Sequence, residues 1–326
     1  MATGATSNPS TVESTADAGP WASLKGKIKS HYDLLSEYYY SLWGEHIHHG
    51  YFLDDPTDTK EAAQRRLISL LLERSNVPAG SRVLDVGCGV GGTSRQLARE
   101  HSCSVTGVTI SGKQVEIAKR LSNDEAAKVS KESPDSLESL GEEWISLPPG
   151  KVRFIELDAE KMGEYFDGTD GKEGDYDAVW ISEAMSHLPH KQLFFDNAFK
   201  LLKSGGSGKL VVADWFKAEG LDDKQMEDDI KPIEAGMLLP PLCTMSEYVE
   251  HAKKAGFKVY SEPFDISENV KKTWDISLSL IQNPSLWMLA IAAGRDIISF
   301  LRAFQAMRRG YNNKTFKYAV ITFEKA

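Results

Sequence analysis

The sequence is poor in cysteine, in long hydrophobic runs and in positive charge, and each shortage excludes a class of protein. Its 326 residues include three cysteines, Cys88, Cys103 and Cys243, which cannot all pair, so a disulfide framework is not expected. The longest apolar stretch, residues 286–293, is too short to span a bilayer. The net charge of −9 offers no basic surface for nucleic acid or for an anionic membrane. Secreted, membrane-spanning and nucleic-acid-binding proteins are therefore disfavoured.

The N-terminal segment, residues 1–19, lacks the features of a targeting sequence. It is rich in Ala, Ser and Thr and contains no Lys or Arg. A secretory signal begins with basic residues, and a mitochondrial transit peptide is rich in arginine. We predict a disordered tail here and expect a cytoplasmic protein, either a monomer or a homodimer.

Strand and helix patterns alternate through the middle of the chain. Short buried runs bounded by turn residues predict strands, and longer stretches with a helical period predict helices. The predicted strands cover residues 82–86, 104–108, 152–157, 178–181, 209–213, 258–263 and 317–323. The predicted helices before and between them cover residues 60–75, 93–100, 112–121 and 191–203. This alternation predicts an α/β fold with a mainly parallel sheet covered on both faces.

We expect a single domain over residues 20–326, built from three consecutive parts. Residues 20–76 would form N-terminal helices and a lid, and residues 81–214 a cofactor-binding core. A polar, acidic surface insertion at residues 122–150 interrupts that core. Residues 215–326 would supply cap helices and the last two strands.

A glycine-rich turn at residues 85–92 (DVGCGVGG) follows the first predicted strand. Gly87, Gly89 and Gly92 match GxGxxG between a strand and a helix, the context in which nucleotide-type ligands bind. Glycines lack Cβ atoms, so a ligand can approach the backbone closely; the alternative is a tight turn without a ligand. We interpret Cys88, within the turn, as a packing residue and not as a nucleophile, because nothing near it in the sequence indicates an activated thiolate.

Two positions distinguish between the possible cofactors. Asp85, directly before the turn, suits an ammonium group better than a pyrophosphate. A nicotinamide site has an acid about 20 residues further on that binds the ribose. Thr109 stands where that acid would be, so the sequence disfavours a nicotinamide cofactor.

Four segments resemble the successive motifs of class I S-adenosylmethionine-dependent methyltransferases: residues 83–92, 105–114, 157–159 and 177–189. Residues 107–111 (GVTIS) with Gln114 are similar to the branch of sterol, cyclopropane-fatty-acid and tocopherol enzymes, which also has Thr in place of the usual acid. Residues 43–51 (WGEHIHHGY), 309–311 and 316–319 look most like the γ-tocopherol C-methyltransferase group.

The resemblance implies a Rossmann-like, doubly wound sheet of seven strands, of which the last is antiparallel. An N-terminal helical lid and helical cap insertions would cover S-adenosyl-L-methionine at the carboxyl ends of the first strands. The residues that the family motifs place around this cofactor are Tyr32, Asp85, Gly87, Gly89, Gly91, Thr109, Ile110, Gln114, Asp158, Ala159, Ser182 and Glu183.

The resemblance also implies roles within that set. The three glycines would hold the methionine and ribose part, with Asp85 near the amino group. Thr109, Ile110 and Gln114 would replace the ribose-binding acid. Asp158 would accept a hydrogen bond from the adenine amino group.

Histidines gather before the first strand and after the fourth. The run of His46, His48 and His49 admits a metal site, a lid over cofactor and acceptor, or a structural cluster. No cysteine or carboxylate at ligand spacing supports a metal. His187 is either a base that takes a proton from the acceptor or a residue that only hydrogen-bonds a turn. We take His187 and His49 as the catalytic candidates.

Residues 32–51 combine side chains that stack with side chains that hydrogen-bond, and we predict a mobile lid hinged at Gly44 and Gly50. Aromatic residues of the expected cap form either a pocket wall or ordinary core. They are Trp274, Trp287, Phe300 and Phe304.

Together these features predict an S-adenosylmethionine-dependent methyltransferase. Its expected acceptor is a small lipophilic molecule, such as a prenylated phenol, a sterol-like compound or an indole or polyketide metabolite, methylated on carbon or nitrogen. Two alternatives stay open: the same fold catalysing a cyclisation or rearrangement, and a non-catalytic subunit that binds the cofactor. No metal is expected.

Overall fold

The protein, seen as a computed structural model, is described over residues 21–53, 55, 57–132, 143–167, 175–281 and 295–326. Its strands are β1 Arg82–Val86, β2 Ser104–Thr109, β3 Ile145–Leu147, β4 Gly150–Glu156, β5 Ala178–Ser182, β6 Lys209–Lys217, β7 Phe257–Asp265 and β8 Phe316–Lys325. The α-helices are α1 Ala22–Trp43, α2 Lys60–Ser75, α3 Gly92–His101, α4 Gly112–Glu132, α5 Met162–Tyr165, α6 Lys191–Leu201, α7 Asp223–Gln225, α8 Lys231–Gly236, α9 Met245–Ala255, α10 Ser267–Val270, α11 Lys272–Ile281 and α13 Arg295–Asn313.

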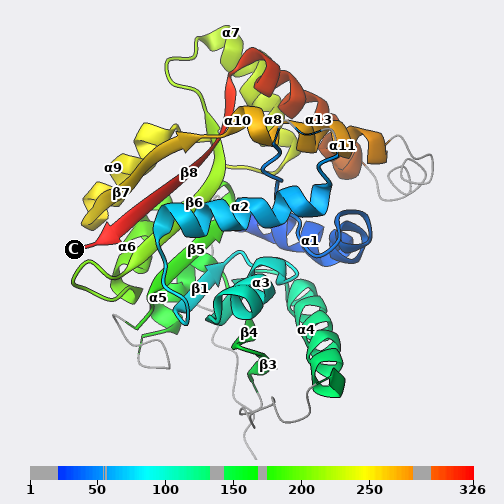
Figure 1. Ribbon diagram of the computed structural model, residues 1–326. Helices are drawn as coiled ribbons and strands as arrows, with labels where there is room; N and C mark the ends of the chain where they lie inside the picture. Colours follow the sequence, from blue (N-terminus) through cyan, green and yellow to red (C-terminus); the bar gives the residue numbers. More distant parts are fainter. Residues whose placement is uncertain (1–20, 54, 56, 133–142, 168–174, 282–294) are drawn as a thin grey trace, which may run out of the picture.

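The strands form one mixed sheet of eight in the order β3-β4-β2-β1-β5-β6-β8-β7 (Figure 1). The five from β4 to β6 in this order are parallel, whereas β3, β8 and β7 pair antiparallel with their neighbours. The chain runs outward from β1 to β2 and β4 and then returns to β5 and β6 on the other side. The strand order therefore reverses at β1 and β5, where α/β sheets bind ligands beyond the carboxyl ends.

The α/β fold class expected from the sequence is confirmed, with one strand more than the seven expected. The extra strand, β3, lies at residues 145–147, within the surface insertion expected at residues 122–150. Pro148 and Pro149 lead into a reversal that pairs β3 with β4 and buries Leu147. Helix α4 also runs to Glu132 instead of ending near residue 121. A strand of three residues is too short to show a period in the sequence, which is why it was missed.

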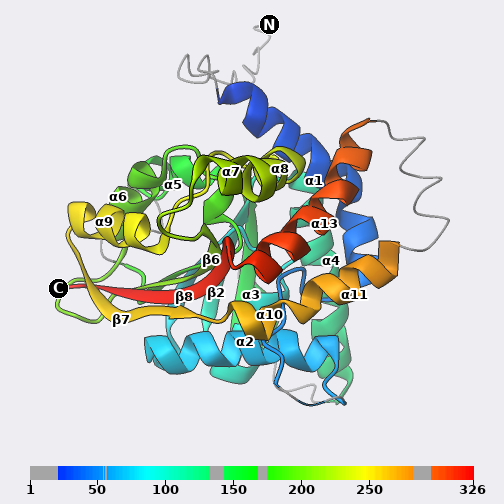
Figure 2. The ribbon, with the colours of Figure 1, turned by 90° about the horizontal axis from the view of Figure 1, so that it is seen from above.

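Side chains of the central strands alternate between two hydrophobic layers. Val83 of β1 belongs to the same core as Leu67 of α2, on one face of the sheet. Leu84, the next residue, belongs to the core of the other face with Phe194 of α6. This period of two explains why buried strands read as continuous apolar runs. Figure 2 shows the layers, with α2 and α3 on one side of the sheet and α5, α6 and α9 on the other.

Helices α1, α11 and α13 gather beyond one end of the sheet, opposite the C-terminus (Figure 2). Because β8 is antiparallel to β6, this is the end to which the parallel strands point. Strand β6 continues to Lys217, so the core expected to end at residue 214 includes Trp215 and Phe216. The tail expected at residues 1–19, Trp287 and the side chain of Phe300 lie outside the described part of the chain.

Candidate active site

A cavity lies beyond the carboxyl ends of β1, β2, β4 and β5, beside α1 and the segment that joins α1 to α2. Eleven of the predicted site residues line it: Tyr32, His49, Gly87, Gly89, Thr109, Ile110, Gln114, Asp158, Ala159, Glu183 and His187. Asp85 and Ser182 line a smaller adjoining cavity, which shares Gly87 and Gly89 with the first. Gly91 lines neither of the two. The convergence follows from the parallel sheet, in which neighbouring strands end at the same edge.

The three predicted glycines have left-handed backbone conformations but different surroundings. A Cβ atom at Gly89 (φ 55°) would meet one side-chain atom, 3.9 Å away. At Gly87 a Cβ would stand 2.3 Å from the Cβ of Ala184, and at Gly91 it would stand 2.7 Å from the ring of Phe154. Gly89 is therefore the position with room for a ligand at the backbone. Close packing against Phe154 accounts for the glycine at Gly91, and its expected contact with the cofactor stays a prediction.

The smaller cavity is bordered by buried polar groups. Asp85 is 2% exposed and accepts a hydrogen bond from Ser94 Oγ at 2.5 Å, and burial raises the pKa of Asp85 to about 6. His46 Nδ1, His48 Nε2 and Ser182 Oγ are buried and have no hydrogen-bond partner among the described residues. An ammonium and a carboxylate on one carbon would satisfy such groups. The residues present thus fit the methionine part of S-adenosylmethionine.

At the end of β2, Thr109 Oγ1 donates to Gln114 Oε1 at 2.6 Å, and both side chains are buried. Beyond β4, Asp158 accepts a hydrogen bond from Lys25 Nζ of α1 at 2.7 Å. The same ammonium bonds to Glu160 at 2.7 Å. The acid expected to bind adenine is therefore also bound to α1. Sequence reasoning missed Lys25, although charged residues recur every fourth position from it along α1.

His187 lies in a short turn after β5 and faces α1. Its Nε2 is 3.4 Å from Tyr32 Oη. Burial, with smaller effects from the charges of His31 and Lys191, lowers the pKa of His187 to about 4. Burial raises the pKa of Tyr32 to about 12. Both side chains are therefore uncharged at neutral pH, and the imidazole can accept a hydrogen bond.

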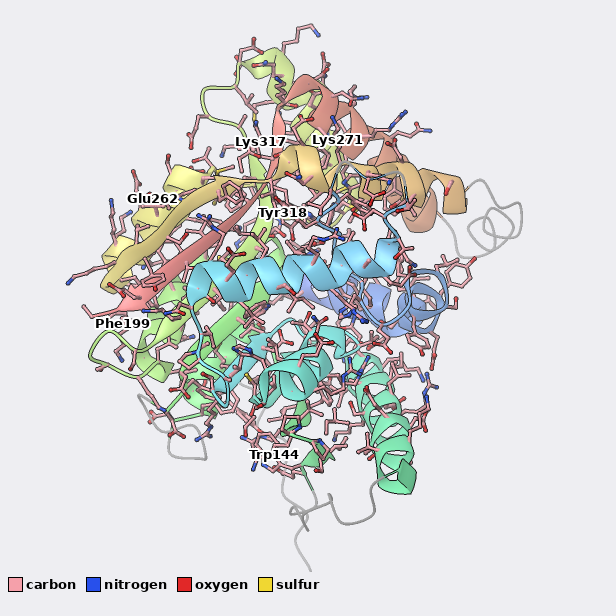
Figure 3. All side chains as sticks on the ribbon, viewed as in Figure 1. Trp144, Phe199, Glu262, Lys271, Lys317 and Tyr318 are labelled. Atoms are coloured by element: carbon pink, nitrogen blue, oxygen red, sulfur yellow. The ribbon has the colours of Figure 1, made fainter. Side chains whose placement is uncertain are left out.

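His49 and Glu183 form a buried pair in the cavity wall. The His49 backbone N–H donates to Glu183 Oε1 at 2.6 Å, and His49 Nδ1 lies 2.9 Å from Oε2. Tyr318 of β8 also donates to Oε1, at 2.8 Å; Figure 3 shows Tyr318 between α2 and α10. Burial opposes ionisation of Glu183, but the electrostatic attraction and the hydrogen bonds that His49 offers outweigh it, and the pKa of the carboxyl is lowered. Glu183, expected beside the cofactor, is thus held by His49 and Tyr318.

The segment between α1 and α2 is held at several points. Gln64 of α2 donates to two of its backbone carbonyls, at 2.7 and 3.0 Å. Gly50 N donates to Thr273 Oγ1 of α11 at 3.2 Å. A Cβ at Gly50 would stand 2.7 Å from the Cβ of Ala63, so close packing accounts for the glycine here, and the hinge expected at Gly50 stays a prediction. Gly44, with φ 81° and open surroundings, keeps the freedom that a hinge needs.

In the part of the chain that the structure describes, no group of three or more His, Cys, Asp or Glu side chains could hold a metal ion. Cys88 is buried, and burial raises the pKa of its thiol well above the usual value. A thiolate nucleophile in the glycine turn is therefore not supported.

Comparison with known proteins decides the family. A mycolic acid cyclopropane synthetase family matches residues 23–134, and a methyltransferase domain matches residues 84–208. The 27-O-demethylrifamycin SV methyltransferase of Amycolatopsis mediterranei (strain S699) is 30% identical over 249 residues, which make up 76% of this chain and 79% of that protein. The chain is a class I S-adenosylmethionine-dependent methyltransferase.

Further relatives of this methyltransferase agree with that family. The probable chloroplastic tocopherol O-methyltransferase of Oryza sativa subsp. japonica is 27% identical over 328 residues, covering 93% of this chain and 78% of the relative. The crystal structure of the cyclase SpnF superposes with a TM-score of 0.70 at 23% identity, covering 92% of this chain and 96% of that one. At this level of identity, the likeness to SpnF shows a shared fold alone.

Apolar and aromatic side chains make up much of the remaining cavity wall of the methyltransferase. They include Ile28, Tyr39, Trp43, Trp215, Met237, Leu238, Trp274 and Phe304. Trp274 and Phe304 also belong to a hydrophobic core. Both alternatives expected from the sequence, pocket wall and core, therefore apply to these two residues. Searched over its described residues, the methyltransferase has no helix long and apolar enough to cross a membrane.

Proposed function

We propose that this methyltransferase transfers a methyl group to a small lipophilic acceptor that carries an ionisable hydroxyl group. The methyl group would go to the hydroxyl oxygen or to a ring carbon that the hydroxyl activates. The observation that carries the proposal is the placement of His49 and His187 in an otherwise largely apolar wall. The relatives named above support it, because they are named for tocopherol and for demethylrifamycin SV. The names of these relatives indicate oxygen as a further possible methyl acceptor, besides the carbon or nitrogen expected from the sequence.

The charges of the cavity argue against a phosphorylated acceptor. Lys25 is the only Lys or Arg among the described lining residues, and it is paired with Asp158 and Glu160. Phosphate groups are usually bound by free arginine or lysine side chains or by helix N-termini. A neutral lipophile matches the apolar wall better.

S-adenosylmethionine, when bound, supplies an electrophilic methyl group on a positively charged sulfur. The residues that we propose to hold it are the cavity-lining members of the predicted set together with Asp85 and Ser182. Gly89 would leave room for it at the backbone, and ionised Asp85 would bind its ammonium group. That contact would offset the burial that raises the pKa of Asp85 to about 6.

The other residues would orient the acceptor, exclude water and remove a proton. Tyr39, Trp43, Trp274 and Phe304 would hold the acceptor ring against the methyl group, and alignment in a closed site supplies much of the acceleration of such displacements. His49 would take the hydroxyl proton through Nε2, which is buried and has no partner among the described residues.

Labelling with deuterated methyl groups tests the proposal. The protein would be incubated with trideuteromethyl-labelled S-adenosylmethionine and, separately, γ-tocopherol, a sterol and a hydroxylated polyketide. We expect one labelled methyl group in the product of at least one hydroxylated acceptor, with one equivalent of S-adenosylhomocysteine released. A product of unchanged mass would instead support cyclisation or rearrangement. Cofactor binding without turnover of any acceptor would support a non-catalytic subunit.

Three further expectations belong to the same proposal. We propose that the enzyme resides in the cytoplasm, acts as a monomer or homodimer, and has no nucleic-acid partner. The small number of thiols supports the cytoplasmic location, and the net charge of −9 supports the absence of a nucleic-acid partner.

A further inference from the structure

We propose that Glu183 and Tyr318 are positioning residues that orient His49 as the general base, and that Glu183 is not a ligand of the cofactor. The inference rests on the proposed function, because a general base is needed only if the acceptor loses a proton. It assigns to Glu183 a role that its family motif does not imply, and it brings in Tyr318 from the C-terminal strand.

The hydrogen bonds define which nitrogen of His49 is free. An ionised carboxylate only accepts, so Nδ1, 2.9 Å from Glu183 Oε2, carries the hydrogen of that bond. The lone pair of the neutral ring is then on Nε2. This atom is buried without a partner among the described residues, and His49 lines the cavity. An imidazole held by a carboxylate at one nitrogen and free at the other has the arrangement of a general base.

Glu183 is bound on both oxygens. Oε1 accepts the His49 backbone N–H at 2.6 Å and the Tyr318 hydroxyl at 2.8 Å, and Oε2 faces His49 Nδ1. Three protein groups therefore already stabilise this carboxylate, out of about four hydrogen bonds that it can accept. Asp85, in contrast, has Ser94 as its side-chain partner and more need of a cofactor ammonium group.

The backbone at Glu183 is strained in a way that this geometry explains. Among the described residues, five that are not glycine have a positive φ: Asn76, Ser102, Glu183, Leu238 and Lys314. All but Glu183 lie just after the ends of α-helices, where a left-handed residue is common. Glu183, with φ 55°, follows a strand, and its N–H is held by Ala213 O at 2.8 Å. Such strain persists where surrounding structure enforces it and is common at functional sites.

The ring of His49 is also fixed from three sides. Its centroid lies 5.9 Å from that of Trp215, 5.0 Å from that of Trp274 and 5.1 Å from that of Tyr318. The next residue, Gly50, is anchored to Thr273 by its N–H. The imidazole therefore has little freedom to turn away from Glu183. Fixed orientation of the base is what a carboxylate in this position would supply.

Five other titratable groups interact electrostatically with Glu183. They are Tyr32 of α1, His48 of the joining segment, His187 after β5, Tyr311 of α13 and Tyr318 of β8. Burial lowers the pKa of both histidines and raises the pKa of the three tyrosines. All five groups are therefore uncharged at pH 7.5.

Two variants test the inference by turnover and cofactor binding, with a matched control. We expect Glu183→Gln to bind S-adenosylmethionine within about twofold of the unchanged protein by calorimetry, while kcat falls by about 100-fold or more. Tyr318→Phe should lower kcat by about 3- to 10-fold with KM unchanged. Tyr311→Phe, which removes a buried hydroxyl with no bond to Glu183, should change neither. Thermal unfolding of each variant identifies any loss of fold.

The pH profile distinguishes positioning from simple packing. Tyr318→Phe removes a hydrogen bond that disperses the negative charge of Glu183, so the imidazolium of His49 becomes more stable. The acid limb of kcat/KM should therefore move to higher pH, by a few tenths of a unit. An unchanged profile with reduced activity would reduce Tyr318 to a packing role. Tenfold or greater loss of cofactor affinity in folded Glu183→Gln would make Glu183 a cofactor ligand, and either outcome overturns the proposal.

A readout without turnover separates this inference from the proposed function. Nitrogen NMR of the protein with labelled histidine reports which nitrogen of His49 carries hydrogen. We expect the Nδ1–H form at pH 7.5 and a mixture of both forms in Glu183→Gln. An Nε2–H or doubly protonated ring in the unchanged protein would overturn the inference, whatever the acceptor panel shows. Absence of methyl transfer to every acceptor with the expected NMR result would overturn only the proposed function.

Discussion

The glycines of the turn at residues 87–91 illustrate how one residue type serves different purposes. Gly91 and Gly87 have no room for a Cβ atom, because Phe154 and Ala184 lie within 2.7 and 2.3 Å of the position it would take. Gly89 has room, since its nearest side-chain atom would be 3.9 Å away. Substitution at the first two therefore affects folding, and substitution at Gly89 affects chiefly the ligand.

We predict that Gly89→Val abolishes cofactor binding in a protein that still folds. The left-handed backbone makes any side chain at this position cost about 1–2 kcal/mol of stability, and the new methyl groups would occupy space beside the cavity. Gly205→Val is the control, because Gly205 has φ 82° with nothing within 4 Å of a Cβ and lies outside the cavity lining. Calorimetry should find lost affinity for Gly89→Val and normal affinity for Gly205→Val. Equal affinities would contradict the assignment of Gly89.

At the scale of the element, α1 is tied to the ends of the strands by one row of side chains. Charged residues at every fourth position lie on the same helix face: Lys25, Lys29, Asp33 and Glu37. Their partners, in the same order, are Asp158 with Glu160, Glu156, Ser111 and Arg120. These partners follow or end β4 and β2 or belong to α4. A helix that is held in this way closes the side of the cavity on which Asp158 lies.

We expect Lys25→Met to weaken S-adenosylmethionine binding by about 5- to 10-fold. The change removes a half-buried ammonium that bridges two carboxylates, and such contacts are worth about 1 kcal/mol. It also leaves Asp158 and Glu160 facing each other without a cation. Lys27→Met on the exposed side of α1 is the control and should bind normally. Isothermal calorimetry at low salt and in about 1 M salt measures both. An affinity of Lys25→Met equal to that of Lys27→Met at low salt would refute the role of this row.

At the scale of the whole molecule, buried carboxyls make stability depend on pH. Asp214, at 0% exposure in the middle of β6, accepts a hydrogen bond from Tyr248 at 2.8 Å. Burial raises the pKa of Asp214 from 3.8 to about 6. The folded state thus binds the proton more tightly than the unfolded state. The carboxyl therefore lowers stability progressively as pH rises from about 4 to about 6, and the full effect persists above that.

We predict that Asp214→Asn raises the free energy of unfolding more at pH 8 than at pH 4. Two units of pKa correspond to about 3 kcal/mol, and the neutral amide does not pay that cost of ionisation. Asp223→Asn, at an exposed position, should show no such difference. Urea unfolding at the two pH values gives the free energies. If the variant and the unchanged protein differ in free energy of unfolding by the same amount at pH 4 and at pH 8, that result would falsify this account.

Much of the fold could be predicted because it depends on local patterns. Helix α2 begins and ends at the predicted residues, since Thr59 caps its first turn and Asn76 takes the left-handed conformation at its end. Strand β1 likewise has its predicted bounds, and two glycines of the turn after it line the cavity. Periodicity, caps and turn residues are properties of a few neighbouring residues, so the amino-acid sequence alone determines them.

The partners of the site residues were decided only by the tertiary structure. His49 and Glu183 are 134 positions apart, and Tyr318 is another 135 from Glu183. They meet because β8 inserts beside β6 and because the segment before α2 crosses the ends of the strands. Lys25 reaches Asp158 for the same reason, across 133 positions. The sequence alone determined which residue types and local elements are present. Which side chains share a hydrogen bond depends on strand order and chain crossing, and no local pattern encodes these.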